Sequence, residues 1–202
     1  MSYELVIDTS REFIMLGLIK DEGYVFKRVD VGREISKYLL NELILFLDEN
    51  SCDKSKIVKI YCGRGPGAFT GIRLALSVAK TMSYALNTEL YSFSSILFYN
   101  LFVENRKVIG IDDARSYKYY YGFLDKDDMS VYEGVDEDPD VVEYCDLRDD
   151  CLVVSTREFI NISTKIISDF SYFDIECFKK LSVLEDYYTF KPKYIKKIDS
   201  EV

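Results

Sequence analysis

A run of closely spaced glycines constrains the fold of this chain more than any other feature: Gly63-Arg64-Gly65-Pro66-Gly67-Ala68-Phe69-Thr70-Gly71. An apolar segment at 57–62, typical of a buried strand, precedes the run, and residues 72–86 follow it with helical spacing. Glycine permits positive φ angles and close backbone approach, so we expect a tight turn between the strand and the helix. Thr70 is the predicted N-cap of this helix.

This glycine run has two interpretations. A strand, a glycine-rich turn and a helix can hold a phosphate with backbone N–H groups and the helix dipole. The run lacks the Lys-Ser/Thr ending of a P-loop, and its four glycines do not give the GxGxxG spacing. The alternative is a rigid strand-to-helix connection that serves packing, and the loop alone favours it.

The composition excludes several kinds of chemistry. The chain has 202 residues with 48% hydrophobic content, enough for the core of one large or two small domains. It contains no histidine, which excludes a Ser-His-Asp triad and a histidine metal centre but leaves an all-carboxylate magnesium site open. Its five cysteines are widely spaced without a CxxC, so we expect reduced thiols.

Neither a membrane span nor a leader peptide is expected. No apolar run approaches about 20 residues, and the first residues lack a basic region followed by an apolar one. We therefore expect a cytoplasmic protein without membrane contact.

Charge is concentrated near the end of the chain. Residues 125–150 hold twelve acidic side chains against Lys126 and Arg148, while the whole chain has a net charge of −9. Such a block is typically a solvated face, or otherwise a surface for a protein partner, and it would repel a nucleic-acid backbone. Four lysines form a modest basic tail: Lys191, Lys193, Lys196 and Lys197.

The expected elements divide the chain into two α/β halves. In the first half, a helix reaching Asn50 follows three strands, and the helix at 96–103 begins at Ser94 and Ser95. Strands are expected at 3–8, 13–20, 23–30, 57–62 and 89–93 in the first half, and at 107–112, 117–124, 129–135 and 151–155 in the second. A helix is expected at 158–169, whereas 175–184 is ambiguous. We therefore predict two domains, 1–104 and 105–202.

The two main helices of the first half carry more apolar surface than one sheet requires. In the helix after the glycine run, apolar side chains leave only a narrow polar stripe, so it should be covered on two sides, by its own domain or by another chain. The preceding helix should expose Leu40 and Phe46 away from its main stripe. This surplus makes a partner interface a candidate function.

Five motifs together resemble the TsaB (YeaZ) family over nearly the full length. They are Ile7-Asp8-Thr9-Ser10, the glycine run through Arg73, Ser92-Phe93-Ser94-Ser95-Ile96, Ile111-Asp112-Asp113-Ala114-Arg115 and Lys191-Pro192-Lys193-Tyr194-Ile195. The glycine run is the most specific of them. One departure is that family members often carry a histidine at the start of the first helix, where this chain has Arg33-Glu34-Ile35-Ser36.

The resemblance implies an α/β, actin-like ASKHA fold with two lobes, each with a mixed sheet flanked by helices. It implies a non-catalytic partner subunit in tRNA N6-threonylcarbamoyladenosine formation, which binds and activates a TsaD-type transferase and is joined by a TsaE-type ATPase. Contact with tRNA would be indirect, through the complex, and the chain alone could form a homodimer. ATP and a metal ion would be bound through the partner subunits and none by this chain alone.

The implied interface lies on the two helices, with no catalytic residue and no metal ligand in this chain. The predicted interface residues are Leu39, Leu40, Leu43, Phe46, Ile72, Arg73, Leu76, Ala79, Lys80 and Met82. The candidate nucleotide contacts are Asp8, Thr9, Arg64 and Gly65. The alternative function is a stand-alone ATP-dependent kinase or hydrolase with Asp8, Asp112 and the glycine run at its site. The absence of any glycine after Gly134 disfavours it, because an ATPase of this fold needs a glycine-bearing turn in each lobe and another late in the chain.

Overall fold

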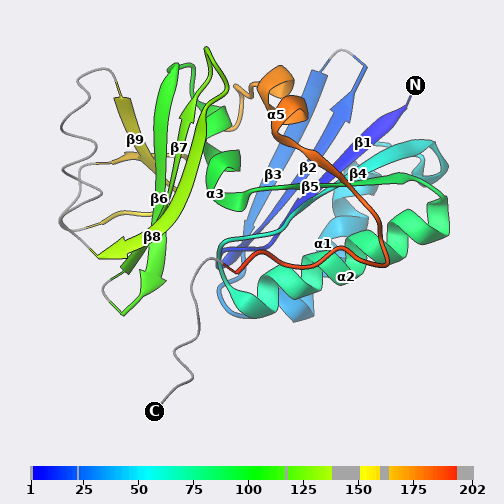
Figure 1. Cartoon of the computed structure of the whole chain (residues 1–202). Coiled ribbons are helices and arrows are strands. Elements are labelled where there is room, and N and C mark those ends of the chain that lie inside the picture. The colour runs from blue at the N-terminus through cyan, green and yellow to red at the C-terminus, as the bar shows by residue number, and fades with distance from the viewer. Residues whose placement is uncertain (1, 22, 117, 138–150, 160–163, 195–202) are drawn as a thin grey trace. The chain divides into compact units, whose positions relative to one another are not determined.

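A computed structural model describes residues 2–21, 23–116, 118–137, 151–159 and 164–194, and the chain forms two compact units (Figure 1). The first unit, called here the N-terminal lobe, comprises Met1–Ser95 and Leu181–Pro192, and the second, the C-terminal lobe, comprises Ile96–Lys180 and Lys193–Val202. The predicted single division after residue 104 differs in two respects. The first lobe ends at Ser95, and a late segment of the chain returns to it.

The N-terminal lobe is built on a six-stranded mixed sheet. Its first three strands form an antiparallel meander, and β4 and β5 add in parallel beside β1. The spatial order is β11-β5-β4-β1-β2-β3. The strands are β1 (Tyr3–Asp8), β2 (Phe13–Lys20), β3 (Gly23–Asp30), β4 (Ile57–Gly63), β5 (Glu89–Phe93) and β11 (Val183–Glu185). The five strands expected in this half are confirmed, with β4 one residue longer than predicted.

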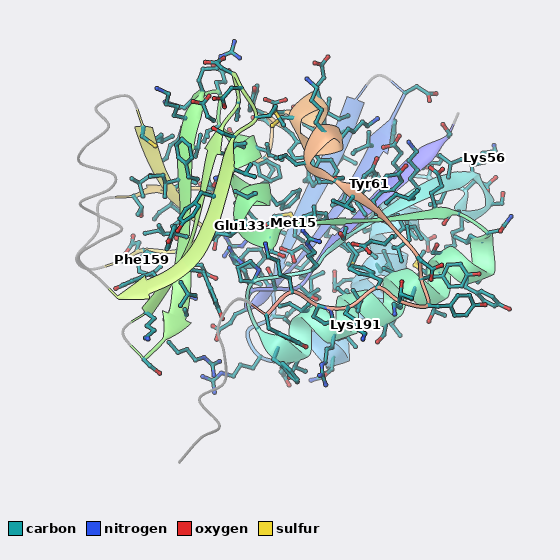
Figure 2. The ribbon with its side chains drawn as sticks, viewed as in Figure 1. Met15, Lys56, Tyr61, Glu133, Phe159 and Lys191 are labelled. Atoms are coloured by element: carbon teal, nitrogen blue, oxygen red, sulfur yellow. The ribbon has the colours of Figure 1, made fainter. Side chains whose placement is uncertain are left out.

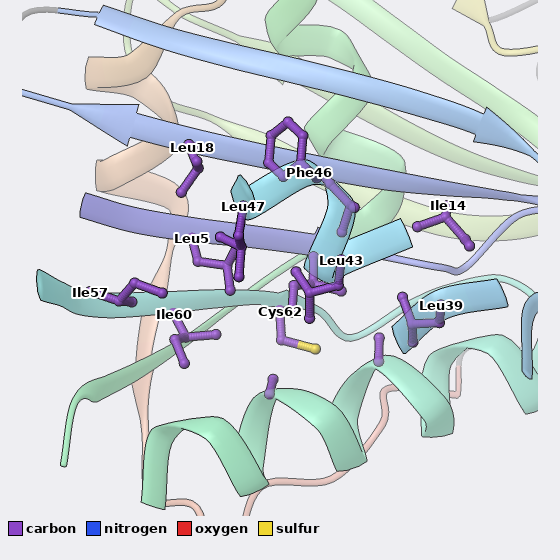
Figure 3. Close-up of a cluster of buried hydrophobic side chains, with 14 of the residues drawn as sticks. Leu5, Ile14, Leu18, Leu39, Leu43, Phe46, Leu47, Ile57, Ile60 and Cys62 are labelled. Carbon is purple, nitrogen blue, oxygen red and sulfur yellow. The ribbon is translucent and has the colours of Figure 1, made fainter. Parts of the chain in front are cut away.

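Two helices pack on the sheet of this lobe and enclose its core. Helix α1 (Ile35–Glu49) contacts β2, and α2 (Phe69–Leu86) contacts β4, while a short 3-10 turn, η1 (Lys54–Lys56), leads into β4. Because strand side chains alternate, every second residue of β1 and β2 points toward the helices. Leu5, Leu18, Leu43, Phe46 and Ile60 meet in this core (Figure 3).

The C-terminal lobe contains a five-stranded sheet in the order β10-β9-β6-β7-β8. Its strands are β6 (Lys107–Arg115), β7 (Lys118–Asp125), β8 (Val131–Glu137), β9 (Cys151–Ser155) and β10 (Lys165–Ile166). Helix α3 (Ser95–Phe98) begins where Ser94 and Ser95 predicted a start, but the chain tightens into the 3-10 helix η2 (Tyr99–Phe102). The Nδ2 of Asn100 in η2 donates to the carbonyl of Gly122 at 2.8 Å, which ties this helical segment to β7.

The helix predicted at 158–169 is wrong for its described part. Residues 160–163 lie outside the described residues, and Lys165–Ile166 form β10, which pairs in parallel with β9. The N–H of Ile167 donates to Ser155 at 2.7 Å. The segment is rich in β-branched isoleucines, so tertiary pairing with β9 prevails over its apparent helical spacing. The ambiguous stretch at 175–184 contains both a helix, α5 (Ile175–Leu181), and the start of β11.

The acidic segment 125–150 is described up to residue 137, where it forms the β7–β8 hairpin. Within it Lys126 is buried, and its Nζ donates to the carbonyl of Val103 at 2.5 Å and lies 3.7 Å from a carboxylate oxygen of Asp174. This lysine therefore joins the hairpin to two other segments of its lobe. Of the basic tail, Lys193 pairs with Glu133, and Lys196 and Lys197 lie outside the described residues.

A pair of neighbouring residues on α1 tests the packing. Leu43 is 4% exposed within the core, whereas Ile44 is 50% exposed. Leu43→Ala should lower the free energy of unfolding by about 2–5 kcal/mol, because it leaves a cavity in the core. Ile44→Ala should change it by about 0.5 kcal/mol or less. Urea titration followed by circular dichroism measures both, and equal effects would contradict this core.

Candidate functional site

The glycine loop, residues 63–71, leaves the end of β4 and enters the first turn of α2. Gly65 and Gly67 have φ angles of 97° and 151°, which residues with a Cβ rarely adopt, and the Gly65-Pro66 peptide bond is cis. Helix α2 begins at Phe69 after Ala68, without a side-chain cap. The predicted N-cap at Thr70 is therefore wrong, because Thr70 lies inside the first helical turn.

Three glycines of the loop face the turn that follows β1, residues 8–10. A Cβ on Gly71 would lie 1.9 Å from the carbonyl oxygen of Thr9, and one on Gly67 would lie 2.2 Å from that of Ser10. A Cβ on Gly63 would lie 2.3 Å from a carboxylate oxygen of Asp8. These distances leave no room for a side chain, so the glycines are needed because the 8–10 turn packs directly on the loop.

Hydrogen bonds hold the two turns together. The hydroxyl of Thr9 donates to the carbonyl of Gly71 at 2.7 Å, and the N–H of Ala68 donates to the carbonyl of Ser10 at 2.6 Å. The carboxylate of Asp8 is buried and accepts from the N–H of Ser10 at 3.1 Å, from its hydroxyl at 2.9 Å and from the hydroxyl of Ser95 at 3.1 Å. The network fixes Asp8 and Thr9 in place.

The loop does not fit a nucleotide phosphate in this arrangement. The N–H of Arg64 donates to Phe93, that of Gly65 donates to the hydroxyl of Ser95, and that of Ala68 donates to Ser10. Pro66 has no N–H to offer. Most of the donors at positions 64–68 are thus engaged by this lobe, and a phosphate would have to displace the 8–10 turn. Asp8, Thr9 and Gly65, the candidate nucleotide contacts, make hydrogen bonds within this lobe, and their contact with a nucleotide stays a prediction.

A metal site that could help to bind a phosphate is also absent from the described residues. Within the described parts of the chain, no group of three or more carboxylate, cysteine or histidine side chains could hold a metal ion. Asp112, the second acidic residue considered for catalysis, is 3% exposed and accepts from Nε and Nη2 of Arg157 at 3.1 and 2.9 Å. No local pattern indicates Arg157 as its partner, because the two residues are 45 positions apart.

Cys62 lies beside this network at the end of β4. Its thiol is fully buried and donates to the carbonyl of Gly63 at 3.6 Å. Burial, with the nearby charge of Asp8 as a second cause, raises the pKa of Cys62 well above its ordinary value of 9.0. The thiol therefore stays neutral and is a poor nucleophile.

The predicted interface residues fall into two groups. Most are buried within the N-terminal lobe itself: Leu39, Leu43, Phe46, Ile72, Leu76 and Ala79. The expected exposure of Phe46 is wrong, since its side chain is 1% exposed and packs in the lobe's core. Lys80 and Met82 are half-buried, whereas Leu40 and Arg73 are exposed.

Exposed apolar and aromatic side chains do occur on both helices. Leu40 and Ile44 are 60% and 50% exposed, one turn apart on α1, and on α2 Arg73 stacks 3.8 Å over the exposed ring of Phe69. Tyr84, near the end of α2, is 67% exposed. Both helices lie on one face of the sheet and contact each other. Their five exposed side chains, Leu40, Ile44, Phe69, Arg73 and Tyr84, are together called here the outer helix surface. Ile44, Phe69 and Tyr84 are not among the predicted interface residues, although the spacing of Ile44 from Leu40 places both on the same side of α1.

The fold and the loop together define the class of protein. It is a two-lobed actin-like α/β protein in which the 8–10 turn of the same chain packs on the glycine loop. The fold is similar to the crystal structure of an uncharacterized protein with similarity to peptidase YeaZ from Pseudomonas aeruginosa. The TM-score is 0.76 at 24% identity, covering 97% of this chain and 100% of that one. Residues 30–144, more than half of the chain, match the family model described as TsaD: tRNA N6-adenosine threonylcarbamoyltransferase. The chain belongs to the family that this model describes, and the YeaZ structure and the curated relatives support its assignment to TsaB (YeaZ).

Two curated relatives carry the name tRNA threonylcarbamoyladenosine biosynthesis protein TsaB. The relative from Bacillus subtilis (strain 168) is 27% identical over 94 residues, which cover 46% of this chain and 41% of the relative. The relative from Buchnera aphidicola subsp. Baizongia pistaciae (strain Bp) is 33% identical over 95 residues, which cover 46% and 42%. The chain thus matches about two-fifths of the length of these relatives. Among the described residues, no helix combines the length and apolar character that a membrane span requires.

The contact between the two turns predicts a strong effect at Gly71. Gly71→Ala should destabilise the protein by about 3 kcal/mol or more, because its Cβ would overlap the carbonyl of Thr9. Gly23→Ala is the matched control: a Cβ there meets nothing within 4 Å, and a change of about 0.5 kcal/mol or less is expected. Thermal unfolding of both variants measures the difference, and a Gly71→Ala variant as stable as the control would contradict the contact.

The raised pKa of Cys62 predicts a loss of stability in alkali. Above pH 9.0 the unfolded thiol ionises while the folded one stays protonated, so its contribution is complete below that pH and is lost as pH rises. Cys62→Ala should therefore reduce the slope of unfolding free energy against pH, between pH 9 and 10, by up to about 1.4 kcal/mol per unit. Urea titrations across that range compare the slopes. An unchanged slope would show that the thiol ionises equally in both states.

Proposed function

We propose that this chain is a non-catalytic subunit in tRNA threonylcarbamoyladenosine biosynthesis, which binds a TsaD-type transferase through the outer helix surface. Membership of the TsaB family supports the pathway. The observation that carries the non-catalytic role is the glycine loop, whose donors and glycines are engaged by the chain's own 8–10 turn. The chain therefore acts through a surface rather than through a nucleotide site.

The outer helix surface has the composition of a protein-binding site. Leu40, Ile44 and Phe69 offer apolar contact, and Arg73 and Tyr84 belong to the residue types enriched in interface hot spots. Arg73 is already ordered by stacking on Phe69, so a partner would have less side-chain freedom to restrict. The buried residues of both helices pack in the core of the lobe beneath this surface, so a partner could not contact them.

The remaining parts of the proposal concern the assembly. A TsaE-type ATPase joins it, tRNA is contacted through the complex, and ATP and a metal ion are bound by partner subunits in the cytoplasm. The same helix surface would serve a homodimer when the transferase is absent. Because both partners would use one surface, transferase binding and self-association should exclude each other.

Charge substitutions on α1 test the surface. Leu40→Glu and Ile44→Glu should abolish co-purification with the TsaD-type transferase while circular dichroism stays unchanged, because both positions are exposed. Val58→Glu is the matched control, an apolar side chain that is 45% exposed and belongs to β4 rather than to either helix. It should leave binding intact. If both α1 variants still bound the transferase, the assignment of this surface would be contradicted.

A reconstitution assay tests the non-catalytic role. The purified chain alone should show no ATP turnover and no tRNA modification, and adding it to the TsaD-type transferase, the TsaE-type ATPase and the threonylcarbamoyl-adenylate donor should raise modification. Robust ATP hydrolysis by the chain alone would instead support the stand-alone kinase or hydrolase.

A further inference from the structure

Residues 183–190, called here the C-terminal strap, return late in the chain to the N-terminal lobe. The strap begins as β11, which pairs antiparallel with the edge of β5, and then runs beside α2 (Figures 1 and 3). In Figure 2, Lys191 marks where the chain leaves the strap, next to α2. Nearly 90 residues separate it from the rest of its lobe in the sequence, so it is a long-range addition to that lobe.

The strap is attached by three inward side chains. Glu185 accepts from the hydroxyl of Ser92 at 2.6 Å and lies 3.9 Å from Nη1 of Arg64, in the glycine loop. The ring of Tyr187 meets that of Tyr84 on α2 with centroids 5.7 Å apart. Phe190 is 3% exposed and belongs to the same core cluster as the inward faces of α1 and α2. The strap thus contacts the loop, the helix and the core.

The other side chains of the strap face solvent. Val183, Leu184 and Tyr188 are 48%, 60% and 75% exposed. The turn is closed within the strap, because Asp186 accepts from the N–H of Tyr188 at 2.7 Å and from that of Phe190 at 2.9 Å. With β11 only three residues long, attachment to the lobe depends mainly on the three inward side chains. Segments with few buried contacts open at lower free energy than the core.

The strap also contacts one residue of the outer helix surface and one of the glycine loop. Tyr187 supports Tyr84, whose ring belongs to the outer helix surface. Arg64 belongs to the loop from which α2 starts, and its Nε is buried without a hydrogen-bond partner among the described residues. Glu185 is therefore the acidic group that holds this guanidinium. Opening of the strap would release Tyr84 and Arg64 together.

We propose that residues 183–190 form a latch that opens independently of the rest of the N-terminal lobe, and that the closed latch orders the outer helix surface for its protein partner. The second half of this inference rests on the proposed function, since it concerns the same surface. The closed state holds Tyr84 by ring contact and fixes Arg64 near Glu185. The open state leaves the helices folded but removes both supports.

Hydrogen exchange in the full-length chain tests the latch. In the wild type, the amides of Tyr188 and Phe190 should exchange at least about tenfold faster than those of β1 and β4, and Phe190→Ala should accelerate only the strap further. Tyr187→Ala is a milder second variant with the same expected direction, should Phe190→Ala disturb the core. Tyr188→Ala is the matched control, because this exposed tyrosine should leave strap exchange unchanged. The latch would be contradicted if the strap amides exchanged at the same rate as those of β1 and β4 in the wild type, in Phe190→Ala and in Tyr187→Ala.

Binding to the TsaD-type transferase tests the coupling. Tyr187→Ala and Glu185→Gln should weaken binding by about two- to tenfold, the range of one aromatic contact, while Tyr188→Ala should not. Unchanged binding by variants whose strap exchanges faster would overturn the coupling, while loss of binding in Ile44→Glu would still uphold the proposed function. If the wild type does not bind the transferase, the proposed function fails and the coupling fails with it, and exchange still decides the latch.

Discussion

The close packing of two turns, residues 8–10 against the glycine loop, is the contact on which the N-terminal lobe depends. β1 and β4 are parallel neighbours, so their carboxyl ends meet at the same edge of the sheet. There the carbonyls of Thr9 and Ser10 approach Gly71 and Gly67 so closely that no side chain could stand between them. The position where α2 starts over the sheet follows from this contact. The burial of Ala75 and Ala79 against β4 follows in turn, because a shifted helix would bring larger neighbours to the same positions.

The same contact changes what this edge of the sheet can do. The carboxyl ends of parallel strands are where open α/β sheets commonly bind ligands, with backbone N–H groups and a helix N-terminus facing the crevice. Here the chain's own carbonyls and hydroxyls take up those donors, and Asp8 places a buried carboxylate near the position that an anion would occupy. A phosphate would meet charge repulsion as well as occupied donors. Burial of the thiol raises the pKa of Cys62, and the charge of this carboxylate raises it further.

The sequence predicted most strands closely, because alternation of apolar residues and turn residues are local signals. It failed where distant partners decide the structure. The isoleucines near Lys165 pair with β9, which no local pattern shows. Helix α2 starts before Thr70, directly after Ala68, whose N–H donates to the distant Ser10. The glycine density correctly indicated close backbone approach. It could not indicate whether the approaching group was a phosphate or another turn of the same chain, since both need the same absence of Cβ atoms.

Six of the ten predicted interface residues are buried for a related reason. A wide apolar arc measures how much of a helix must be covered, but not what covers it. On α2, the sheet, α1 and the strap supply that cover within the chain, as the buried Leu76 and Phe190 show. Little apolar surface is then left for a partner on α2, and α1 contributes Leu40 and Ile44 instead. Since Tyr84 is both exposed and held by Tyr187, the part of α2 that is left for binding depends on a segment about 100 residues away. The proposed binding surface is therefore a property of the N-terminal lobe with its strap in place rather than of the two helices alone.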